Sequence, residues 1–172
     1  RAMSAPQARI EIRGVSKAFG RHGDASPVMA LAGLDLSVPE GSFVSVVGPS
    51  GCGKTTILRL VDGLVEADAG EVLVSGQPPR PGPEVGFVFQ AFRLIPWATV
   101  QSNVEFALTS LGLPRKERAE RALHYLSMVG LTRFAKSYPG TLSGGMKQRV
   151  ALARAFATDP QILLMDEPVA SL

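Results

Sequence analysis

Hydrophobic and polar residues follow two different patterns along the chain. Alternation, typical of strands with one buried face, occurs over residues 10–15 and 34–38, and residues 71–76 also have the pattern of a strand. Short, mainly apolar runs, typical of strands buried on both faces, occur over residues 43–47, 85–90 and 162–165. Together these patterns predict a small antiparallel sheet near the N-terminus that flanks the parallel sheet of an α/β core.

Helical patterns lie between these strands. Apolar residues recur at helical spacing over residues 56–61, 100–111 and 114–129. Pro114 suits a first helical turn, and Gly130 suits a helix C-terminus. We therefore predict a helical subdomain over residues 91–148, inserted into an α/β core that comprises residues 1–90 and 149–172.

A glycine-rich loop joins the apolar run 43–47 to the helical pattern 56–61. It fits the pattern G-x-x-x-x-G-K-[ST] and reads Gly48, Pro49, Ser50, Gly51, Cys52, Gly53, Lys54, Thr55 and Thr56. Glycines let the backbone curl so that successive N–H groups face phosphate oxygens, and a helix N-terminus adds partial positive charge. Lys54 supplies a full charge for the phosphates, and the Thr55 hydroxyl is placed to ligate Mg²⁺. A glycine-rich turn without a ligand is the alternative.

Two further stretches carry candidate chemistry. Ser143, Gly144 and Gly145 form a turn that opens a helical pattern over 147–156, so they make either a second anion site or an ordinary helix N-cap. The apolar run 162–165 ends in Asp166 and Glu167. In a chain with a phosphate loop, two acids at a strand end predict a metal and water site, and a plain strand-end turn is the alternative.

Composition narrows the remaining choices. The chain has 172 residues, enough for one domain with a real core, and its net charge is +3. Its Lys and Arg residues are scattered, so we expect no nucleic-acid partner. The single cysteine, Cys52, cannot form an internal disulfide, which favours a reducing cytosol. No apolar run is long enough to span a bilayer.

With these motifs in order, the sequence resembles the ATP-binding subunit of ABC transporters. The matching pieces are the phosphate loop 48–56, Gln90 at a strand end, the signature Leu142-Ser143-Gly144-Gly145-Met146 and the acidic strand 162–167. The signature is the family-specific piece, because a phosphate loop alone leaves all P-loop ATPases and GTPases open. The resemblance implies an α/β P-loop NTPase (RecA-type) fold, with a parallel-sheet core, an N-terminal antiparallel β subdomain and a helical insertion.

The resemblance also assigns roles, with ATP and Mg²⁺ as the ligands. It implies that Glu167 is the general base that aims water at the γ-phosphate, and that Lys54 and Gln90 complete the catalytic set. It implies that Asp166 holds Mg²⁺ together with Thr55 and the amide oxygen of Gln90.

Two other parts of the nucleotide site follow from the resemblance. Phe19 lies where the family stacks an aromatic ring on adenine, and a phenylalanine packed in the core is the alternative. Ser143, Gly144 and Gly145 would bind the γ-phosphate of the nucleotide held by a second subunit. The resemblance therefore implies a head-to-tail homodimer with two ATP molecules at its interface.

An importer branch is indicated by residues 94–100 and by the signature with Met146. Both are similar to subunits that energise uptake of nitrate, sulfonates, taurine or a similar small solute. The similarity implies transmembrane permease subunits as partners, a solute-binding protein as an indirect partner, and a peripheral position on the cytoplasmic face of the inner membrane. Trp97 and Phe92 form a hypothetical permease contact, and packing inside the helical subdomain is the alternative. Other chains recognise the cargo, so these residues do not name it.

The sequence departs from the family pattern in two ways. Met146 stands where Gln is usual, and we expect function to survive this change. The chain ends at Leu172, before the further strand and catalytic His of the family, and its own His22 and His124 lie upstream. We therefore expect a C-terminally truncated subunit that is weakly active or inactive alone. A soluble ABC-type ATPase not linked to transport, and a module that binds ATP without turnover, stay open as alternatives.

Overall fold

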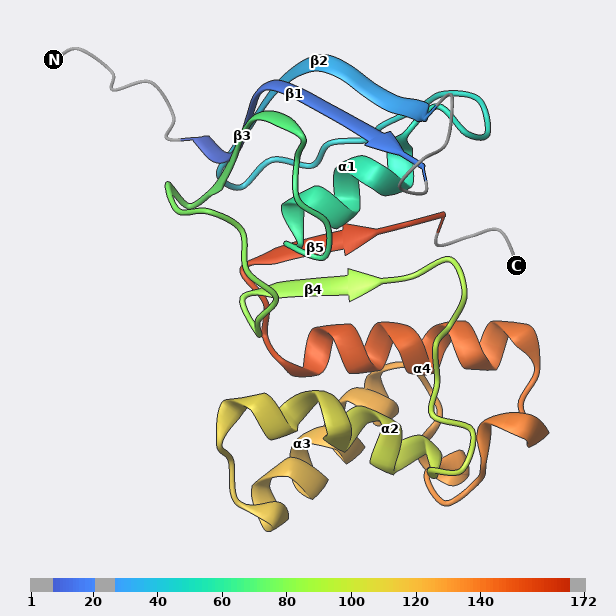
Figure 1. The fold of residues 1–172 in the computed structure, drawn as a ribbon. Coiled ribbons are helices and arrows are strands. Elements are labelled where there is room, and N and C mark those ends of the chain that lie inside the picture. The colour runs from blue at the N-terminus through green and yellow to red at the C-terminus, as the bar shows by residue number, and fades with distance from the viewer. Residues whose placement is uncertain (1–7, 21–26, 168–172) are drawn as a thin grey trace, which may run out of the picture. The chain divides into compact units, whose positions relative to one another are not determined.

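The computed structural model describes residues 8–20 and 27–167 (Figure 1). The chain divides into two compact units, residues 1–81 and residues 82–172. The first unit contains β1 (Ala8–Phe19), β2 (Val28–Pro39), α1 (Lys54–Val61) and β3 (Ala69–Val74). The second contains β4 (Val85–Val88), α2 (Val100–Ala107), α3 (Arg115–Met128), α4 (Gly144–Ala157) and β5 (Ile162–Met165). The predicted subdomain boundaries at residues 90 and 148 differ from this division and stay a prediction.

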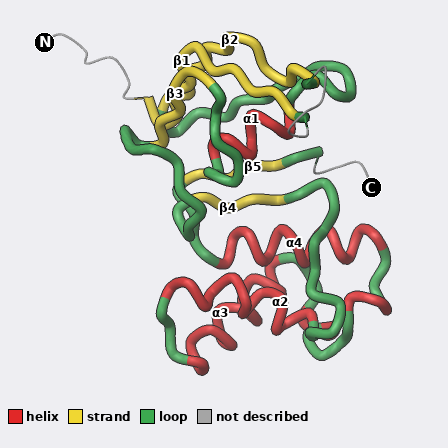
Figure 2. Tube along the Cα trace, viewed as in Figure 1, coloured by secondary structure: helices red, strands yellow, loops and turns green. Residues whose placement is uncertain are grey.

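The first unit is built on a three-stranded antiparallel sheet in the order β2-β1-β3, drawn in yellow in Figure 2. Alternation along β1 buries Ile10 and Ile12 on one face of the strand. On β3, Val74 and Val72 pair with these two residues and are buried as well. Helix α1 packs against β3 on this unit's apolar side. The antiparallel β subdomain predicted from the alternation is confirmed.

Strand β1 is irregular around Gly14, where β3 crosses it closely. The pairing of β1 with β3 shifts register between Arg13 and Ser16, and Gly14 has a φ of +57°. A Cβ on Gly70 of β3 would lie 2.4 Å from the carbonyl oxygen of Gly14. Only glycine permits this approach, so the start of β3 is fixed against the bulge of β1.

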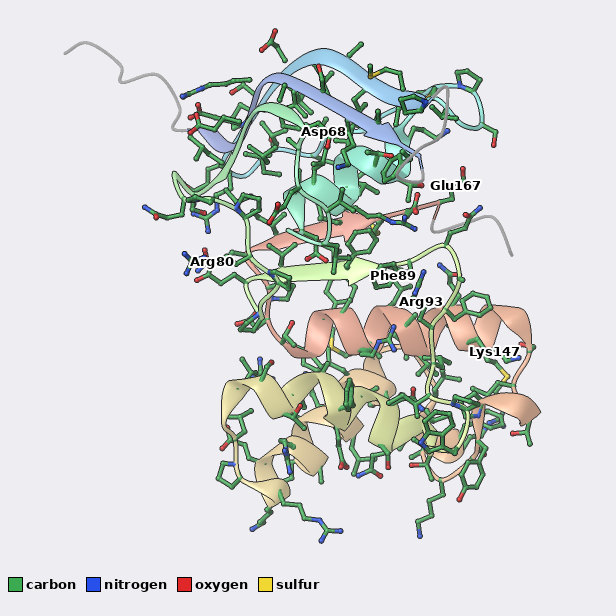
Figure 3. All side chains as sticks on the ribbon, in the orientation of Figure 1. Asp68, Arg80, Phe89, Arg93, Lys147 and Glu167 are labelled. Carbon is green, nitrogen blue, oxygen red and sulfur yellow. The ribbon has the colours of Figure 1, made fainter. Side chains whose placement is uncertain are left out.

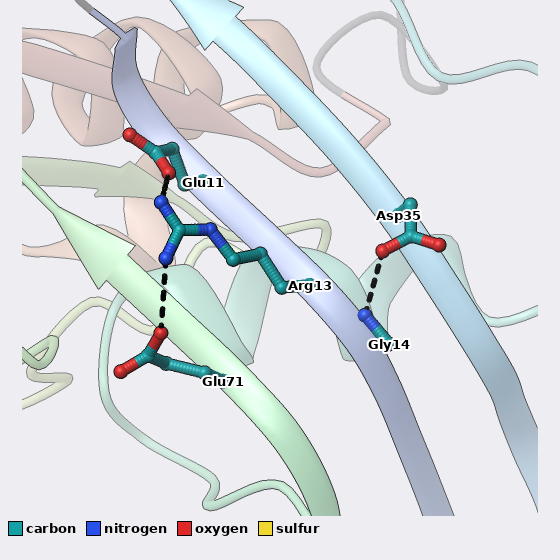
Figure 4. Close-up of polar contacts among 5 residues, drawn as sticks. All are labelled: Glu11, Arg13, Gly14, Asp35 and Glu71. Atoms are coloured by element: carbon teal, nitrogen blue, oxygen red, sulfur yellow. Dashed lines mark hydrogen bonds and ion pairs between the residues drawn. The ribbon is translucent and has the colours of Figure 1, made fainter.

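Polar contacts hold the bulge from both neighbouring strands (Figure 4). The guanidinium of Arg13 lies between Glu11 of its own strand and Glu71 of β3, with Nη1 at 3.4 Å from Glu71 Oε2. On the other side, the backbone N–H of Gly14 donates to Asp35 Oδ1 of β2 at 2.7 Å. These exposed pairs orient the strands more than they stabilise them.

Residues 43–47, which the sequence predicts as a buried strand, do not form a strand. Residues 42–49 have no regular secondary structure, and among the described residues no strand pairs with them. Phe43 is 86% exposed and Val47 is 89% exposed. An apolar run becomes a buried strand only where neighbours take its backbone hydrogen bonds, and here β2 and β3 both pair with β1. The prediction of a buried strand is therefore wrong for these residues.

The second unit contains a two-stranded parallel sheet, in which Val85 pairs with Ile162 and Val88 with Met165. Helix α4 packs on β4 through Gly86, where a Cβ would lie 2.8 Å from the ring of Pro160 and 3.1 Å from the carbonyl oxygen of Ala155. Strands form over both predicted stretches and are parallel as expected; β4 covers Val85–Val88, and both strands are partly buried.

The helices of the second unit share one apolar core. Helix α2 continues into a 3-10 turn (Leu108–Leu111), and two more such turns (Thr132–Phe134 and Pro139–Thr141) lead from α3 to α4. Gly130, with a φ of +71°, follows α3 as predicted. The buried core comprises Val100, Val104, Leu108, Ala122, Leu126, Leu131, Ala135, Leu142, Val150, Ala153 and Ala157. No helix in the described part of the chain is long and apolar enough to cross a membrane.

Candidate nucleotide-binding site

The phosphate loop runs directly into helix α1. The backbone N–H of Cys52 donates to the carbonyl of Pro49 at 3.3 Å, which closes a turn, and α1 begins at Lys54. Gly51 and Gly53 have φ values of +82° and +96°, in the left-handed region that favours glycine. Gly53, the N-cap of α1, makes no side-chain cap hydrogen bond, and a helix N-terminus of this kind is a common site for an anion.

Two glycines of the loop allow close approaches that a side chain would block. A Cβ on Gly53 would lie 2.6 Å from the carbonyl oxygen of Ala30 in β2, and a Cβ on Gly48 would lie 2.6 Å from Cys52 Sγ. The end of the loop therefore packs against strand β2, and this contact fixes the position of the N-terminus of α1 within the first unit.

Lys54 folds back over the loop. Its ammonium Nζ donates to the carbonyl oxygens of Gly48 and Pro49, each at 2.9 Å. Charged phosphate oxygens are stronger acceptors than these carbonyls, so a bound triphosphate would compete for the ammonium. The chain thus provides glycines, a helix N-terminus without a side-chain cap and a positive charge at one point, and this set fits a nucleoside triphosphate.

Strand pairing brings Phe19 near the phosphate loop. Phe19 pairs with Val28 across β1 and β2, and Val28 lies two residues before Ala30, which contacts Gly53. Two strand residues span roughly 7 Å, so Phe19 pairs with β2 close to the part of that strand that the end of the loop touches. The ring is 41% exposed and is therefore not packed in the core.

In the second unit, the ends of β4 and β5 bring Gln90 and Glu167 together. The two strands are parallel and in register at Val88 and Met165, so the residues that follow leave the sheet at one edge. Gln90 Nε2 donates to Glu167 Oε2 at 2.6 Å. In this arrangement the amide oxygen of Gln90 is the atom left for a cation.

The two neighbouring acids at this edge lie in different surroundings. Asp166 is 6% exposed, and its backbone N–H donates to the carbonyl of Val88 at 2.9 Å. Glu167, labelled in Figure 3, is exposed and has a φ of +48°. A non-glycine residue in this region costs about 1 kcal/mol or more, and such strain concentrates at functional sites. A buried acid suits a fixed cation ligand, whereas an exposed one suits contact with water.

The signature turn forms a capped helix start. Ser143 is the N-cap of α4, and its Oγ accepts a hydrogen bond from the backbone N–H of Met146 at 3.3 Å. A Cβ on Gly144 or Gly145 would meet nothing within 4 Å, so the space above both residues is open. Capping and anion binding therefore both fit this turn, and its role toward nucleotide stays a prediction.

The predicted Mg²⁺ ligands come from both units. Thr55 belongs to α1, whereas Gln90 and Asp166 follow β4 and β5. In residues 8–20 and 27–167, no three His, Cys, Asp or Glu side chains gather as in an all-protein metal site. Mg²⁺ commonly takes one or two protein oxygens together with phosphate and water, so the donor types fit. The assembly of these ligands with Lys54 and the phosphate loop stays a prediction.

A protein-family model described as ABC transporter matches residues 31–170. The chain belongs to the ABC transporter family. The match covers the phosphate loop, Gln90, the signature and the acidic strand, so the resemblance drawn from these motifs is confirmed.

Relatives place the ABC transporter chain among ATP-binding subunits. A putative ATP-binding protein of Brucella abortus is 54% identical over 145 residues, which is 84% of this chain and 56% of that protein. The nitrate import ATP-binding protein of Synechocystis is 47% identical over 165 residues, which is 95% of this chain and 61% of that protein. The chain thus spans about three fifths of the length of these relatives.

A solved structure confirms the P-loop NTPase fold. The dimeric structure of a post-hydrolysis state of an ATP-binding cassette bound to ADP and Pi superposes with a TM-score of 0.86 at 37% identity. The superposition covers 95% of this chain and 75% of that one.

Two features of the ABC transporter chain escape the sequence patterns. Arg154 of α4 donates to the carbonyls of Phe92 at 3.0 Å and Arg93 at 2.7 Å, and so holds the segment after Gln90. Phe106 of α2 is exposed beside Trp97, and both line a groove of about 550 Å³ with Ile95, Ala98, Ser102, Glu105, Thr109 and Arg118. The helical spacing of residues 100–111 could have marked Phe106 as lying outside the buried face of the helix. No local sequence signal predicts the hydrogen bonds from Arg154 to residues 92 and 93.

Proposed function

We propose that this ABC transporter chain binds and hydrolyses MgATP, and thereby energises an importer of nitrate or a similar small solute. The observation that carries the proposal is the phosphate loop, whose uncapped helix start and folded-back Lys54 suit a triphosphate. The identity with the nitrate import protein supports the transport role. Sulfonate and taurine stay within the proposed solute class.

Binding begins with the backbone of the phosphate loop. The N–H groups at the start of α1 donate hydrogen bonds to the phosphate oxygens, and Lys54 moves from the carbonyls of Gly48 and Pro49 to the β- and γ-phosphates. Thr55 supplies a hydroxyl oxygen to Mg²⁺, which neutralises phosphate charge when bound. Phe19 stacks on the adenine ring, because its exposed face lies on the strand pair that touches the loop.

Hydrolysis is assigned to the acidic edge of the second unit. Asp166 and the amide oxygen of Gln90 complete the cation ligands, and Glu167 accepts a proton from the attacking water. The contact between Gln90 Nε2 and Glu167 Oε2 orients the carboxylate and the amide toward one another. Because Glu167 is exposed and Asp166 is buried, only the former has room for a water molecule at its oxygens.

The remaining parts of the proposal concern assembly. Ser143, Gly144 and Gly145 bind the γ-phosphate of a nucleotide on a second copy, which gives a head-to-tail homodimer on the cytoplasmic face of the inner membrane. The groove beside Trp97 receives a helix of a transmembrane permease subunit, since Trp97 is 81% exposed and apolar surface of this kind marks protein contacts. A solute-binding protein delivers the cargo to the permease.

Uptake into proteoliposomes tests the proposal. The full-length protein, reconstituted with its permease subunits and solute-binding protein, should couple ATP hydrolysis to uptake of nitrate, an alkylsulfonate or taurine. Lys54→Ala should abolish both hydrolysis and uptake, whereas Lys116→Ala, which alters an exposed pair with Glu120, should change neither. ATP hydrolysis by a protein that joins no membrane subunit would contradict the transport role.

A further inference from the structure

The turn before β3 reaches across to the end of β1. The backbone N–H of Asp68 donates to the carbonyl of Ser16 at 2.9 Å, and Ala69, the first residue of β3, also pairs with Ser16. The close crossing of Gly70 over Gly14 fixes this turn against the strand. Asp68 therefore lies where the pairing of β1 with β3 ends. Its contact in β1 there, Ser16, is three residues before Phe19.

The carboxylate of Asp68 continues the ladder beyond that point. Its Oδ2 accepts a hydrogen bond from the backbone N–H of Ala18 at 2.7 Å. Its Oδ1 accepts a hydrogen bond from Lys17 Nζ at 2.6 Å. A side chain thus takes the place of a strand carbonyl and holds β1 in extended form up to the residue before Phe19. The same two hydrogen bonds lower the pKa of Asp68, which keeps the carboxylate ionised.

Lys17 carries this contact on to the aromatic ring. Lys17 and Phe19 lie two residues apart in β1, and their side chains lie beside one another. Lys17 Nζ lies 5.7 Å from the centre of the Phe19 ring, within the range of a cation–π contact. The side chain of Lys17 is only 15% exposed, so the ammonium is held between carboxylate and ring.

We propose that Asp68 is a positioning residue for the nucleotide base: it holds the backbone at Ala18 and the ammonium of Lys17, and so fixes the Phe19 ring at the angle needed to stack on adenine. This inference rests on the proposed binding of ATP at the phosphate loop. Asp68 itself touches neither phosphate nor base, and it acts through the strand end and through Lys17.

Two ligands separate base stacking from phosphate binding. Titration calorimetry on the full-length protein would measure the affinity for MgATP and for magnesium tripolyphosphate, which has the phosphates without the base. Asp68→Ala should weaken MgATP binding about three- to tenfold and change tripolyphosphate binding less than about twofold. Asp68→Asn, which retains an acceptor for Ala18 but opposes Lys17 with an amide N–H₂ group, should have a smaller effect of the same kind.

Asp35→Ala is the matched control. Asp35 also accepts a hydrogen bond from a backbone N–H of β1, that of Gly14 at 2.7 Å (Figure 4), and Gly14 lies five residues before Phe19 in that strand. This variant should bind both ligands as the unchanged protein does. Phe19→Ala should weaken MgATP binding about tenfold, and adding Asp68→Ala to it should cause no further loss, because the ring is the only target of the positioning effect.

The outcomes distinguish the inference from the proposed function. Equal weakening of both ligands by Asp68→Ala, full affinity of that variant for MgATP, or additive losses with Phe19→Ala would each overturn the positioning role. Failure of the unchanged protein to bind tripolyphosphate or MgATP would overturn the phosphate site itself, and with it the basis of the inference.

Discussion

The phosphate loop and the acidic strand edge hold their functional groups by different means. In the first unit the backbone sets the geometry, because Gly53 packs against the Ala30 carbonyl where no Cβ fits and the N-terminus of α1 has no side-chain cap. In the second unit side chains set the geometry, through the hydrogen bond from Gln90 to Glu167 and the hydrogen bonds from Arg154 to two backbone carbonyls. Affinity should therefore depend on the first unit, and turnover on individual polar side chains of the second.

The largest expected effect is on turnover. Glu167→Gln should lower kcat about 10²- to 10⁴-fold in the full-length subunit, because it removes the proton acceptor while it retains an acceptor for Gln90 Nε2. The dissociation constant for MgATP should change less than about threefold. Steady-state phosphate release and calorimetry measure the two quantities, and Glu120→Gln on exposed α3 is the control. Unchanged turnover would remove Glu167 from the catalytic set.

The next effect concerns affinity in the first unit. Lys54→Ala should weaken MgATP binding at least about 100-fold, because it removes the ammonium held over the loop carbonyls. Thermal unfolding without nucleotide should be nearly unchanged, since those carbonyls can turn to water. Retention of tight MgATP binding by Lys54→Ala would contradict the role of the ammonium. It would mean that the loop backbone alone binds the phosphates.

Arg154 tests whether side chains govern the second unit. Burial lowers the pKa of its guanidinium, which stays charged, and the two hydrogen bonds to Phe92 and Arg93 compensate for lost solvent. Arg154→Ala should reduce the free energy of unfolding by about 2–3 kcal/mol and reduce kcat more than MgATP affinity. Arg149→Ala removes one exposed bond to the carbonyl of Val129 and is the matched control. If both variants lowered the free energy of unfolding equally in denaturant titrations, the two hydrogen bonds of Arg154 would have no larger role than the single one of Arg149.

The smallest effect is a pH dependence in the first unit. Burial at the end of α1 raises the pKa of Asp62 from 3.8 to about 6. The folded state therefore prefers the protonated acid, and the free energy of unfolding falls by about 2 kcal/mol as the pH rises from about 4 through 6. Asp62→Asn should abolish this fall and be the more stable form at pH 7. Parallel urea titrations of both proteins at pH 4 and pH 7 measure the difference.

Much of the fold and of the site could be predicted from local patterns. The strand patterns over residues 10–15 and 71–76 predict the antiparallel sheet, and the runs at 85–90 and 162–165 predict the parallel pair. The phosphate-loop pattern places Gly53 and Lys54 at a helix start, as the structure has them. These features depend on neighbours in sequence, so the sequence pattern carries them.

Other features depend on partners far apart in the chain. The run 43–47 has the composition of a buried strand, but burial requires flanking strands that no local pattern guarantees. Asp68 resembles any turn acid until the register of β1 and β3 places it beside Ala18, 50 residues away. Arg154 and Phe92 are likewise separated by 62 residues. Long-range polar contacts of this kind leave no periodic signal.

The open run at 43–47 also affects how the protein behaves in solution. Its exposed Phe43 and Val47 combine an apolar, β-prone surface with a backbone that pairs with no described strand. Such a segment is a template for strand addition between molecules, the first step of cross-β aggregation. We expect this polypeptide to aggregate increasingly as its concentration rises, and a charged substitution such as Val47→Lys to slow that process without moving the glycines of the loop that follows.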